Sequence, residues 1–178
     1  MKKQNIRTLK KRRRKGKTDY KARLGLLKSP FPRIAVRKTN RYVMAQYIQT
    51  REAQDYVIKE ANSKELLKYG WKKEQEGSLK SLPACYFTGL LLGKKIKQIE
   101  KGKGKKAILD AGLIRNVKGS RIYAVLKGLV DNGIEINHEK TSLPDEKRIR
   151  GEHLKSKIEF EKVKNKLLET SLIKNSKS

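Results

Sequence analysis

The residues of this sequence with the clearest chemistry are the lysines and arginines among its first 28 positions. Thirteen cationic side chains lie there, opposed only by the carboxylate of Asp19. Cations at this density bind phosphates, because each neutralised phosphate releases a condensed counterion. A solvated tail or a localisation signal is the alternative, but we favour an arm that becomes ordered on phosphates. The candidate contacts in it are Lys10, Lys11, Arg12, Arg13, Arg14, Lys15, Lys17, Thr18, Tyr20 and Arg23.

The overall charge indicates the same kind of partner. The chain has 178 residues, with 46 Lys and Arg against 18 Asp and Glu, which gives a formal net charge of +28. Such self-repulsion calls for a polyanion, and nucleic acid is the expected one. No apolar stretch of the sequence is long enough to span a membrane, and the charged N-terminal residues do not resemble a secretory signal peptide. We expect a cytoplasmic protein without a membrane partner.

Two further basic groups follow the arm. The first lies on a predicted strand and turn near the base of the arm, so the two regions are expected to form one surface; it comprises Arg33, Arg37, Lys38, Asn40 and Arg41. The second lies in a loop that leads into a predicted helix, and it comprises Arg115, Lys118, Gly119, Ser120 and Arg121. Free backbone N–H groups at a helix start and the cations around them should attract an anion there.

Residues typical of covalent or metal chemistry are few. Cys85 is the only cysteine, and its helical spacing with apolar residues favours a packing role over a nucleophilic one. His138 and His153 do not have the spacing of a zinc site with it. The basic loop at 101–106 lacks the glycine spacing of a phosphate-binding P-loop. We therefore expect no metal and no cofactor.

Hydrophobic periodicity places these groups on an α/β scaffold with a single mixed sheet. Alternating residues predict a three-stranded antiparallel meander at 33–39, 42–49 and 55–59, with Asn40 and Arg41 in the first turn. An apolar run at 107–109 predicts a fourth strand, and 134–136 is expected to be extended. The acidic residue after the fourth strand, Asp110, is expected at the end of a buried strand.

Helices are expected between and after these strands. Capping and breaker residues predict them at 20–27 with Thr18 or Asp19 as the cap, at 64–69, from Ser81 onward, and from Ser120 to Gly133. Gly89 and Gly93 are expected to let the helix after Ser81 approach the sheet closely. A long charged helix is predicted at 145–169, and its narrow apolar stripe suggests that it docks on a larger partner.

These expectations divide the chain into three parts. Residues 1–28 form a basic RNA-binding arm, residues 29–137 form the α/β domain, and residues 138–178 form a C-terminal loop, a charged helix and a disordered tail. Trp71, which follows the predicted helix end at Gly70, is expected to cover the edge of the domain rather than to stack on a base.

Several motifs also resemble a known family, the 5S-rRNA-binding protein of the large ribosomal subunit, which is protein eighteen in the universal naming and protein five in the eukaryotic naming. The motifs follow the family's order along most of the chain. They are KRRRKGKTDY at 11–20, RIAVRKTNRY at 33–42, KYGW at 68–71, LPACYFTGLLLG at 82–93, LDAGL at 109–113, KGSRIYAVLKG at 118–128 and LPDEKRIRGEH at 143–153. The arm and the KYGW and RGEH segments are similar to the archaeal and eukaryotic branch, and the compact length favours an archaeal type.

The resemblance implies a non-enzymatic component of the central protuberance. Its partners would be 5S rRNA, the large-subunit rRNA and the neighbouring 5S-binding ribosomal protein. The arm at 10–20 with Arg23, and the hairpin at 33–41, match segments of the family that contact RNA, and residues 118–121 match its most recognisable motif.

Two other functions remain open from the residues alone. A general RNA chaperone would need only the basic arm. A nuclease would need at least two of the carboxylates Asp19, Asp55 and Asp110 to converge on metal ions, and nothing in their spacing brings them together.

Overall fold

The computed structural model describes residues 9–52, 54–72, 77–99, 106–154 and 159–169. The predicted α/β class is confirmed, because one mixed five-stranded sheet is packed with helices. The strand order is β3-β2-β1-β4-β5, with β1 to β3 antiparallel and β4 parallel to both β1 and β5. The strands are β1 (Arg33–Lys38), β2 (Val43–Arg51), β3 (Gln54–Asn62), β4 (Lys106–Asp110) and β5 (Glu135–Ile136).

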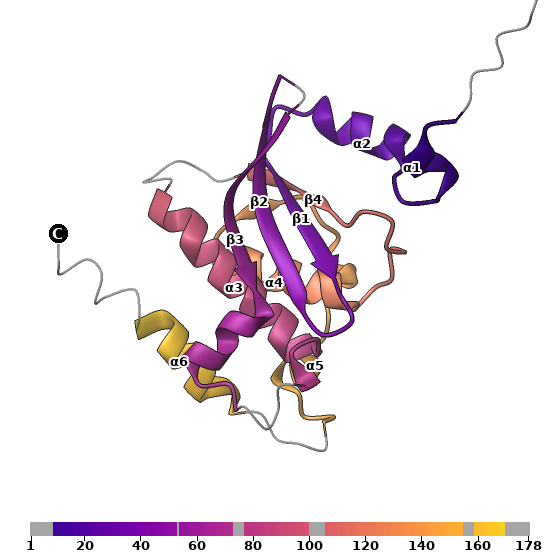
Figure 1. The fold of residues 1–178 in the computed structure, drawn as a ribbon. Helices are drawn as coiled ribbons and strands as arrows, with labels where there is room; N and C mark the ends of the chain where they lie inside the picture. Colours follow the sequence, from indigo (N-terminus) through magenta and orange to yellow (C-terminus); the bar gives the residue numbers. More distant parts are fainter. Residues whose placement is uncertain (1–8, 53, 73–76, 100–105, 155–158, 170–178) are drawn as a thin grey trace, which may run out of the picture.

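The predicted meander forms, with longer second and third strands than expected. The turn falls at Asn40 and Arg41 as predicted, and it is closed by the Thr39 amide, which donates to the Tyr42 carbonyl at 2.8 Å. The β2–β3 hairpin extends well beyond the helices that cover the sheet, and its tip lies beside the arm (Figure 1). The extended piece at 134–136 is a fifth strand of two residues, which is too short for periodicity to reveal its pairing.

Helices α3 (Leu82–Ile99) and α4 (Arg121–Asp131) cover one face of the sheet behind the meander (Figure 1). The sequence predicted that the glycines of α3 let this helix pack closely on the sheet, but they face α4 instead. A Cβ at Gly89 would lie 2.1 Å from the Val125 carbonyl oxygen, and one at Gly128 would lie 2.2 Å from the Tyr86 carbonyl oxygen. The missing side chains therefore let the backbones of α3 and α4 touch, and only glycine fits at these two positions.

The short helical turn η1 (Ser63–Tyr69) follows the meander. A capping box between Asn62 and Glu65 opens it, and Gly70 closes it with φ of 94°. Trp71 is only 3% exposed, and its ring meets Phe87 edge-on with 6.4 Å between the ring centroids. The predicted covering role of Trp71 is confirmed. Cys85 is also buried in this core, as expected.

The prediction of one long C-terminal helix is wrong, because this segment contains two helices. Helix α5 (Glu146–Arg150) ends at Gly151, whose φ of 78° stops the helix, and α6 (Phe160–Glu169) begins after a turn. Their apolar residues pack within the protein itself, since Ile149, Val163 and Leu167 are buried in the same core as α3. A short turn, η3 (Lys140–Ser142), precedes them. The predictions for the loop at 101–105 and for the tail after 170 lie outside the described residues.

The described part of the arm contains two helices without a buried residue. These are α1 (Lys11–Arg14), which the sequence did not predict, and α2 (Tyr20–Leu27), which it did. Asp19 caps α2, because its Oδ1 accepts from the amides of Lys21 at 2.9 Å and Ala22 at 3.1 Å. The arm leaves the domain beside the tip of the β2–β3 hairpin (Figure 1). None of the helices described is both long and apolar enough to cross a bilayer.

Candidate nucleic-acid interface

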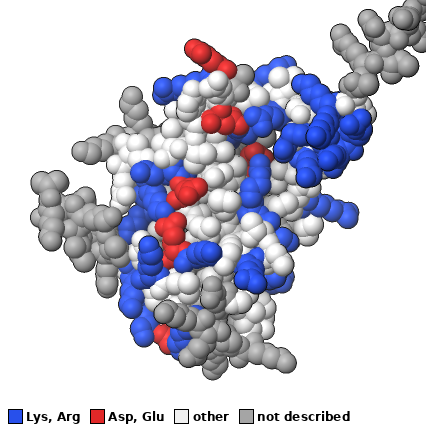
Figure 2. All heavy atoms as spheres, in the orientation of Figure 1, with Lys and Arg blue, Asp and Glu red and all other residues white. Residues whose placement is uncertain are grey.

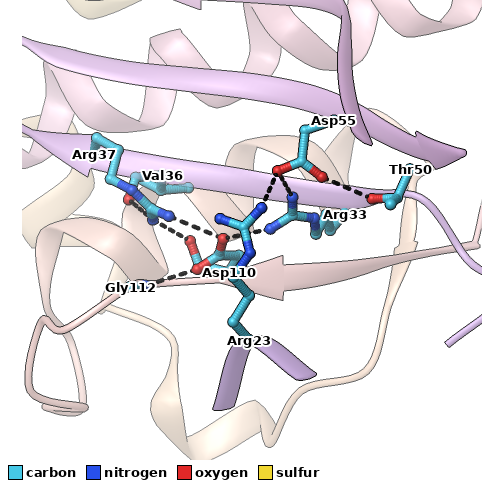
Figure 3. A network of polar contacts seen from close by, with 8 residues as sticks. All are labelled: Arg23, Arg33, Val36, Arg37, Thr50, Asp55, Asp110 and Gly112. Atoms are coloured by element: carbon cyan, nitrogen blue, oxygen red, sulfur yellow. Dashed lines mark hydrogen bonds and ion pairs between the residues drawn. The ribbon is translucent and has the colours of Figure 1, made fainter. Parts of the chain in front are cut away.

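A buried arginine holds two carboxylates together under the arm (Figure 3). Arg33, only 5% exposed, points its guanidinium between Asp55 of β3 and Asp110 at the end of β4. Its Nη2 lies 2.5 Å from Asp55 Oδ2, and its Nη1 lies 3.2 Å from Asp110 Oδ2. The prediction that Arg33 is a surface contact for RNA is therefore not supported: strand pairing of β1 with β2 and β4 places it inside, where it forms ion pairs with two acids.

Asp110 also fixes Arg37. Arg37 Nη2 donates to Asp110 Oδ2 at 2.9 Å, while Nη1 donates to the carbonyls of Asp110 at 2.8 Å and Val36 at 3.0 Å. The second Asp110 oxygen accepts from the Gly112 amide at 2.8 Å. The guanidinium of Arg37 is thus held in one position, although its side chain remains 41% exposed.

Asp55 ties the arm to the hairpin. Arg23 of α2 donates from Nη2 to Asp55 Oδ2 at 2.8 Å, and Thr50 donates to the other oxygen at 3.0 Å. Burial raises the pKa of Asp55. Hydrogen bonds from Arg33 and Thr50 and the charges of Arg33 and Arg23 together lower it by more, so the net shift is downward. The charge of Arg23 is therefore used at least in part by the ion pair with Asp55, although the residue lies beside the other cations of the arm.

The cations of α1 have no such acid. Lys11, Arg12, Arg13, Arg14 and Lys15 are all exposed, and none of them forms an ion pair within the described residues. Arg12 Nε donates to Thr18 Oγ1 at 2.9 Å, and Lys10 Nζ lies 4.8 Å from the centroid of the Tyr20 ring. These contacts shape the arm without neutralising it, so its charge stays available. Figure 2 shows the Lys and Arg side chains crowded over the arm at the upper right.

The arm and the sheet share one cavity of about 760 Å³. Cationic side chains from both sides line it, among them Arg12 and Lys17 of the arm and Arg37 and Lys38 of β1. Asn40 and Arg41 are exposed at the turn that follows. The expected continuity of arm and hairpin is therefore seen, although it runs through Arg37 and Lys38 and not through Arg33.

The loop before α4 is less open to an anion than the sequence suggested. The Gly119 amide donates to the Ser142 carbonyl at 2.9 Å, and the Ser120 amide donates to the Val117 carbonyl at 3.2 Å. Lys118 Nζ lies 3.7 Å from Glu139 Oε1; hydrogen bonds from Thr141 and the charge of Lys118 lower the pKa of Glu139. Two of the amides expected to bind an anion are thus already used, one by η3 and the other by a turn within the loop.

Arginines nevertheless remain exposed around this loop. Arg115 lies in it, and Arg121 starts α4, where Ser120 is the N-cap without a side-chain cap hydrogen bond. A second cavity of about 420 Å³ is lined here by Lys38, Arg121 and Arg148. The loop is therefore a cationic surface built mainly from side chains.

Comparison with known proteins accounts for this combination of fold and charge. Residues 4–103 and 97–139 match the family described as ribosomal large subunit proteins 60S L5 and 50S L18. The large ribosomal subunit protein uL18 of Korarchaeum cryptofilum is 51% identical over 146 residues, which cover 82% of this chain and 71% of that protein. The uL18 protein of Methanococcus maripaludis is 47% identical over 149 residues, covering 84% of this chain and 74% of that protein. The chain belongs to the uL18 family.

The uL18 proteins of these species are archaeal, and the archaeal type expected from the sequence is confirmed. A third relative, the uL18 protein of Aeropyrum pernix, is 44% identical over 156 residues, covering 87% of this chain and 70% of that protein. As a uL18 protein, the chain is a ribosomal component and not an enzyme, and its place is the cytoplasmic ribosome. Ribosomal RNA and other ribosomal proteins are accordingly its partners.

The candidate chemical groups of this uL18 chain take structural positions. Burial raises the pKa of the Cys85 thiol to about 12, which keeps it protonated and unreactive. A His138 ring nitrogen lies 2.6 Å from the Ile136 carbonyl oxygen, and His153 is exposed in the turn after α5. Asp55 and Asp110 do converge, contrary to the sequence prediction, but on the guanidinium of Arg33. A carboxylate neutralised in this way is a poor ligand for a nuclease metal ion.

Sequence reasoning missed the role of Asp55 and Thr50 in holding the arm. Part of this role could be read from the sequence. Asp55 is one of few acids near the arm, and the alternation of polar and apolar residues could show that its strand belongs to the same sheet as that of Arg33. The antiparallel register that brings Thr50 opposite Asp55 appears only when the hairpin is folded.

Proposed function

We propose that this uL18 chain binds 5S rRNA and anchors it in the central protuberance of the large subunit, next to the large rRNA and the neighbouring 5S-binding ribosomal protein. Family membership supports a ribosomal role, and the observation that carries the finer proposal is the arm itself. Its α1 helix presents a run of cations that have no acidic partner among the described residues, beside a cavity whose opposite wall carries Arg37 and Lys38. A rigid sheet facing a cationic arm suits a folded RNA that contacts the protein on two sides.

The two sides would contribute different terms. Exposed cations of the arm neutralise phosphates and give affinity that falls steeply with salt. The sheet and the turn at Asn40 present fixed groups that recognise the shape of the RNA. The proposed contacts are Lys10, Lys11, Arg12, Arg13, Arg14, Lys15, Lys17, Thr18, Tyr20, Arg37, Lys38, Asn40 and Arg41, with Arg23 and Arg33 holding the surface in place.

The loop before α4 forms a second proposed contact. Its exposed cations are Arg115, Lys118 and Arg121, and Arg121 lines a cavity together with Lys38. Gly119 and Ser120 shape the backbone by the bonds from their amides to carbonyls. This surface suits the second of two RNA segments, so one uL18 chain could join 5S rRNA to the large rRNA.

Competition binding tests the proposal. Filter binding of the full chain to labelled 5S rRNA is measured with transfer RNA and a plain RNA duplex as competitors, over a salt series. We expect preference for 5S rRNA to persist as salt rises, because the shape-dependent contacts are less screened than the phosphate contacts. If all three RNAs lost binding equally, the chain would be a general RNA-binding polycation and the 5S proposal would fail.

A further inference from the structure

The cavity between α2 and the sheet has the size and lining of a site for one nucleotide. Its volume of about 760 Å³ lies in the range of small-molecule pockets. Apolar side chains form part of its wall, including Leu26 of α2 and Leu109, Leu113 and Ile114 of β4 and the loop after it. Lys17 of the arm and Lys38 of β1 line the cavity from opposite sides, and neither forms an ion pair with a described residue. Apolar surface beside unneutralised cations suits a base and its phosphates.

Arg37 supplies a flat surface in this wall. Three hydrogen bonds to Asp110 and Val36 use three of the five guanidinium N–H groups and fix its plane. A Cβ at Gly112 would lie 3.1 Å from Nη1, 3.2 Å from Cζ and 3.6 Å from Nε, so the Gly112 backbone lies against the group. Since Gly112 covers one face, the opposite face of the guanidinium is the planar surface that the partly exposed Arg37 offers to the cavity. Unpaired RNA bases stack on such guanidinium planes.

The acids that line the cavity do not oppose an RNA ligand. Asp19 caps α2, Asp55 is paired with Arg23 and Arg33, and Asp110 is paired with Arg33 and Arg37. Asp55 and Asp110 are therefore already paired, and the cations that line the cavity outnumber its acids, so it keeps a net positive character from Arg12, Lys17 and Lys38.

We propose that this cavity receives a single unpaired RNA base, stacked on the Arg37 guanidinium, with the adjoining phosphates held by Lys17 and Lys38. The inference rests on the proposed binding of 5S rRNA, and it adds a base pocket to a surface that would otherwise hold only the RNA backbone. In this arrangement the ion pair between Arg23 and Asp55 holds α2 in place as one wall of the pocket.

Gly25 allows the pocket to be filled without a change of charge. It lies on the cavity wall in α2, and a Cβ added there meets nothing within 4 Å. Gly25→Phe should block the pocket, Gly25→Ala should leave it open, and Gly77→Phe adds the same bulk at an open glycine outside the cavity. Melting curves of the full chain check that all three variants fold.

The test combines binding and cross-linking with 5S rRNA that contains 4-thiouridine. We expect the wild-type chain to cross-link at residues 22–26 or 109–114, and Gly25→Phe to lose these cross-links and bind about tenfold more weakly with an unchanged salt slope. The two control variants should behave as wild type. A Gly25→Phe chain with wild-type affinity and cross-links would overturn the pocket while leaving 5S binding intact. If the wild-type chain showed no preference for 5S rRNA, the proposed function would fail, and the effect of Gly25→Phe on the cross-links would still decide the pocket.

Discussion

Two groups of arginines in this uL18 chain have the same chemistry and opposite surroundings. Arg12, Arg13 and Arg14 lie on α1, exposed and without an acidic partner in the described structure. Arg33 and Arg37 lie on β1 and are bonded to Asp110, which is more than seventy residues away in sequence. The first group is available to a polyanion and the second holds the sheet together. The position of the nearest carboxylate, and not the density of cations, separates the two roles.

The largest expected effect comes from removing the acid of the buried group. Asp110→Asn leaves Arg33 inside the protein with Asp55 as its remaining counter-charge, and Arg33 Nε already has no hydrogen-bond partner in the described structure. We expect the free energy of unfolding to fall by about 3 kcal/mol, because a buried charge is left incompletely paired. Urea unfolding followed by circular dichroism measures it.

Arg13→Ala is the matched control, because it removes an arginine of α1 that has no side-chain partner in the described structure. Its free energy of unfolding should stay within about 0.5 kcal/mol of wild type. Equal losses in Asp110→Asn and Arg13→Ala would remove the distinction between the two groups of arginines.

Two glycines differ in packing as the two groups of arginines differ in charge pairing. In Gly89→Ala the new Cβ would lie 2.1 Å from the Val125 carbonyl oxygen, so α3 and α4 must separate. We expect a loss of about 2 kcal/mol in the free energy of unfolding. Gly25→Ala in the arm meets open space and should cost nothing, or stabilise α2 by up to about 1 kcal/mol. A stable Gly89→Ala chain would show that the two helices are not held in direct contact.

The exposed group should act on binding and leave stability unchanged. Replacing Arg12, Arg13 and Arg14 by alanine should lower the slope of log affinity against log salt by about one unit for each phosphate contact that is lost. The melting temperature should not change, since none of the three is buried. Filter binding across a salt series gives the slope, and an unchanged slope would show that these residues do not lie on the RNA backbone.

The smallest effect is a pH dependence at the link between arm and sheet. The net lowering of the Asp55 pKa means that its ionised form stabilises the fold above the ordinary aspartate pKa, and that this contribution is lost as the pH falls through the lowered value, below about pH 4. Asp55→Asn should therefore be less stable than wild type near neutral pH, and the difference should shrink in acid. Unfolding curves at several pH values measure it; a constant difference would mean that the charge of Asp55 contributes nothing.

Local patterns were sufficient to predict much of this structure. Alternation located the three strands of the meander, and caps such as Asp19 and Gly70 located the helix ends. Gly151 could have ended the predicted C-terminal helix, but a glycine inside a charged helical pattern is compatible with either outcome. The roles of Arg33 and Gly89 depend on partners that lie across the sheet or on another helix, and these partners are set by tertiary packing.

The central claim is that the arm supplies charge and the folded domain supplies selectivity. The most direct test is the ratio of affinities for 5S rRNA and transfer RNA, measured at one salt concentration for the wild-type chain and for the chain with Arg12, Arg13 and Arg14 replaced by alanine. We predict that both affinities fall by a similar factor and that the ratio is kept. A ratio that collapses to one in the variant would contradict the claim, because the arm would then carry the selectivity.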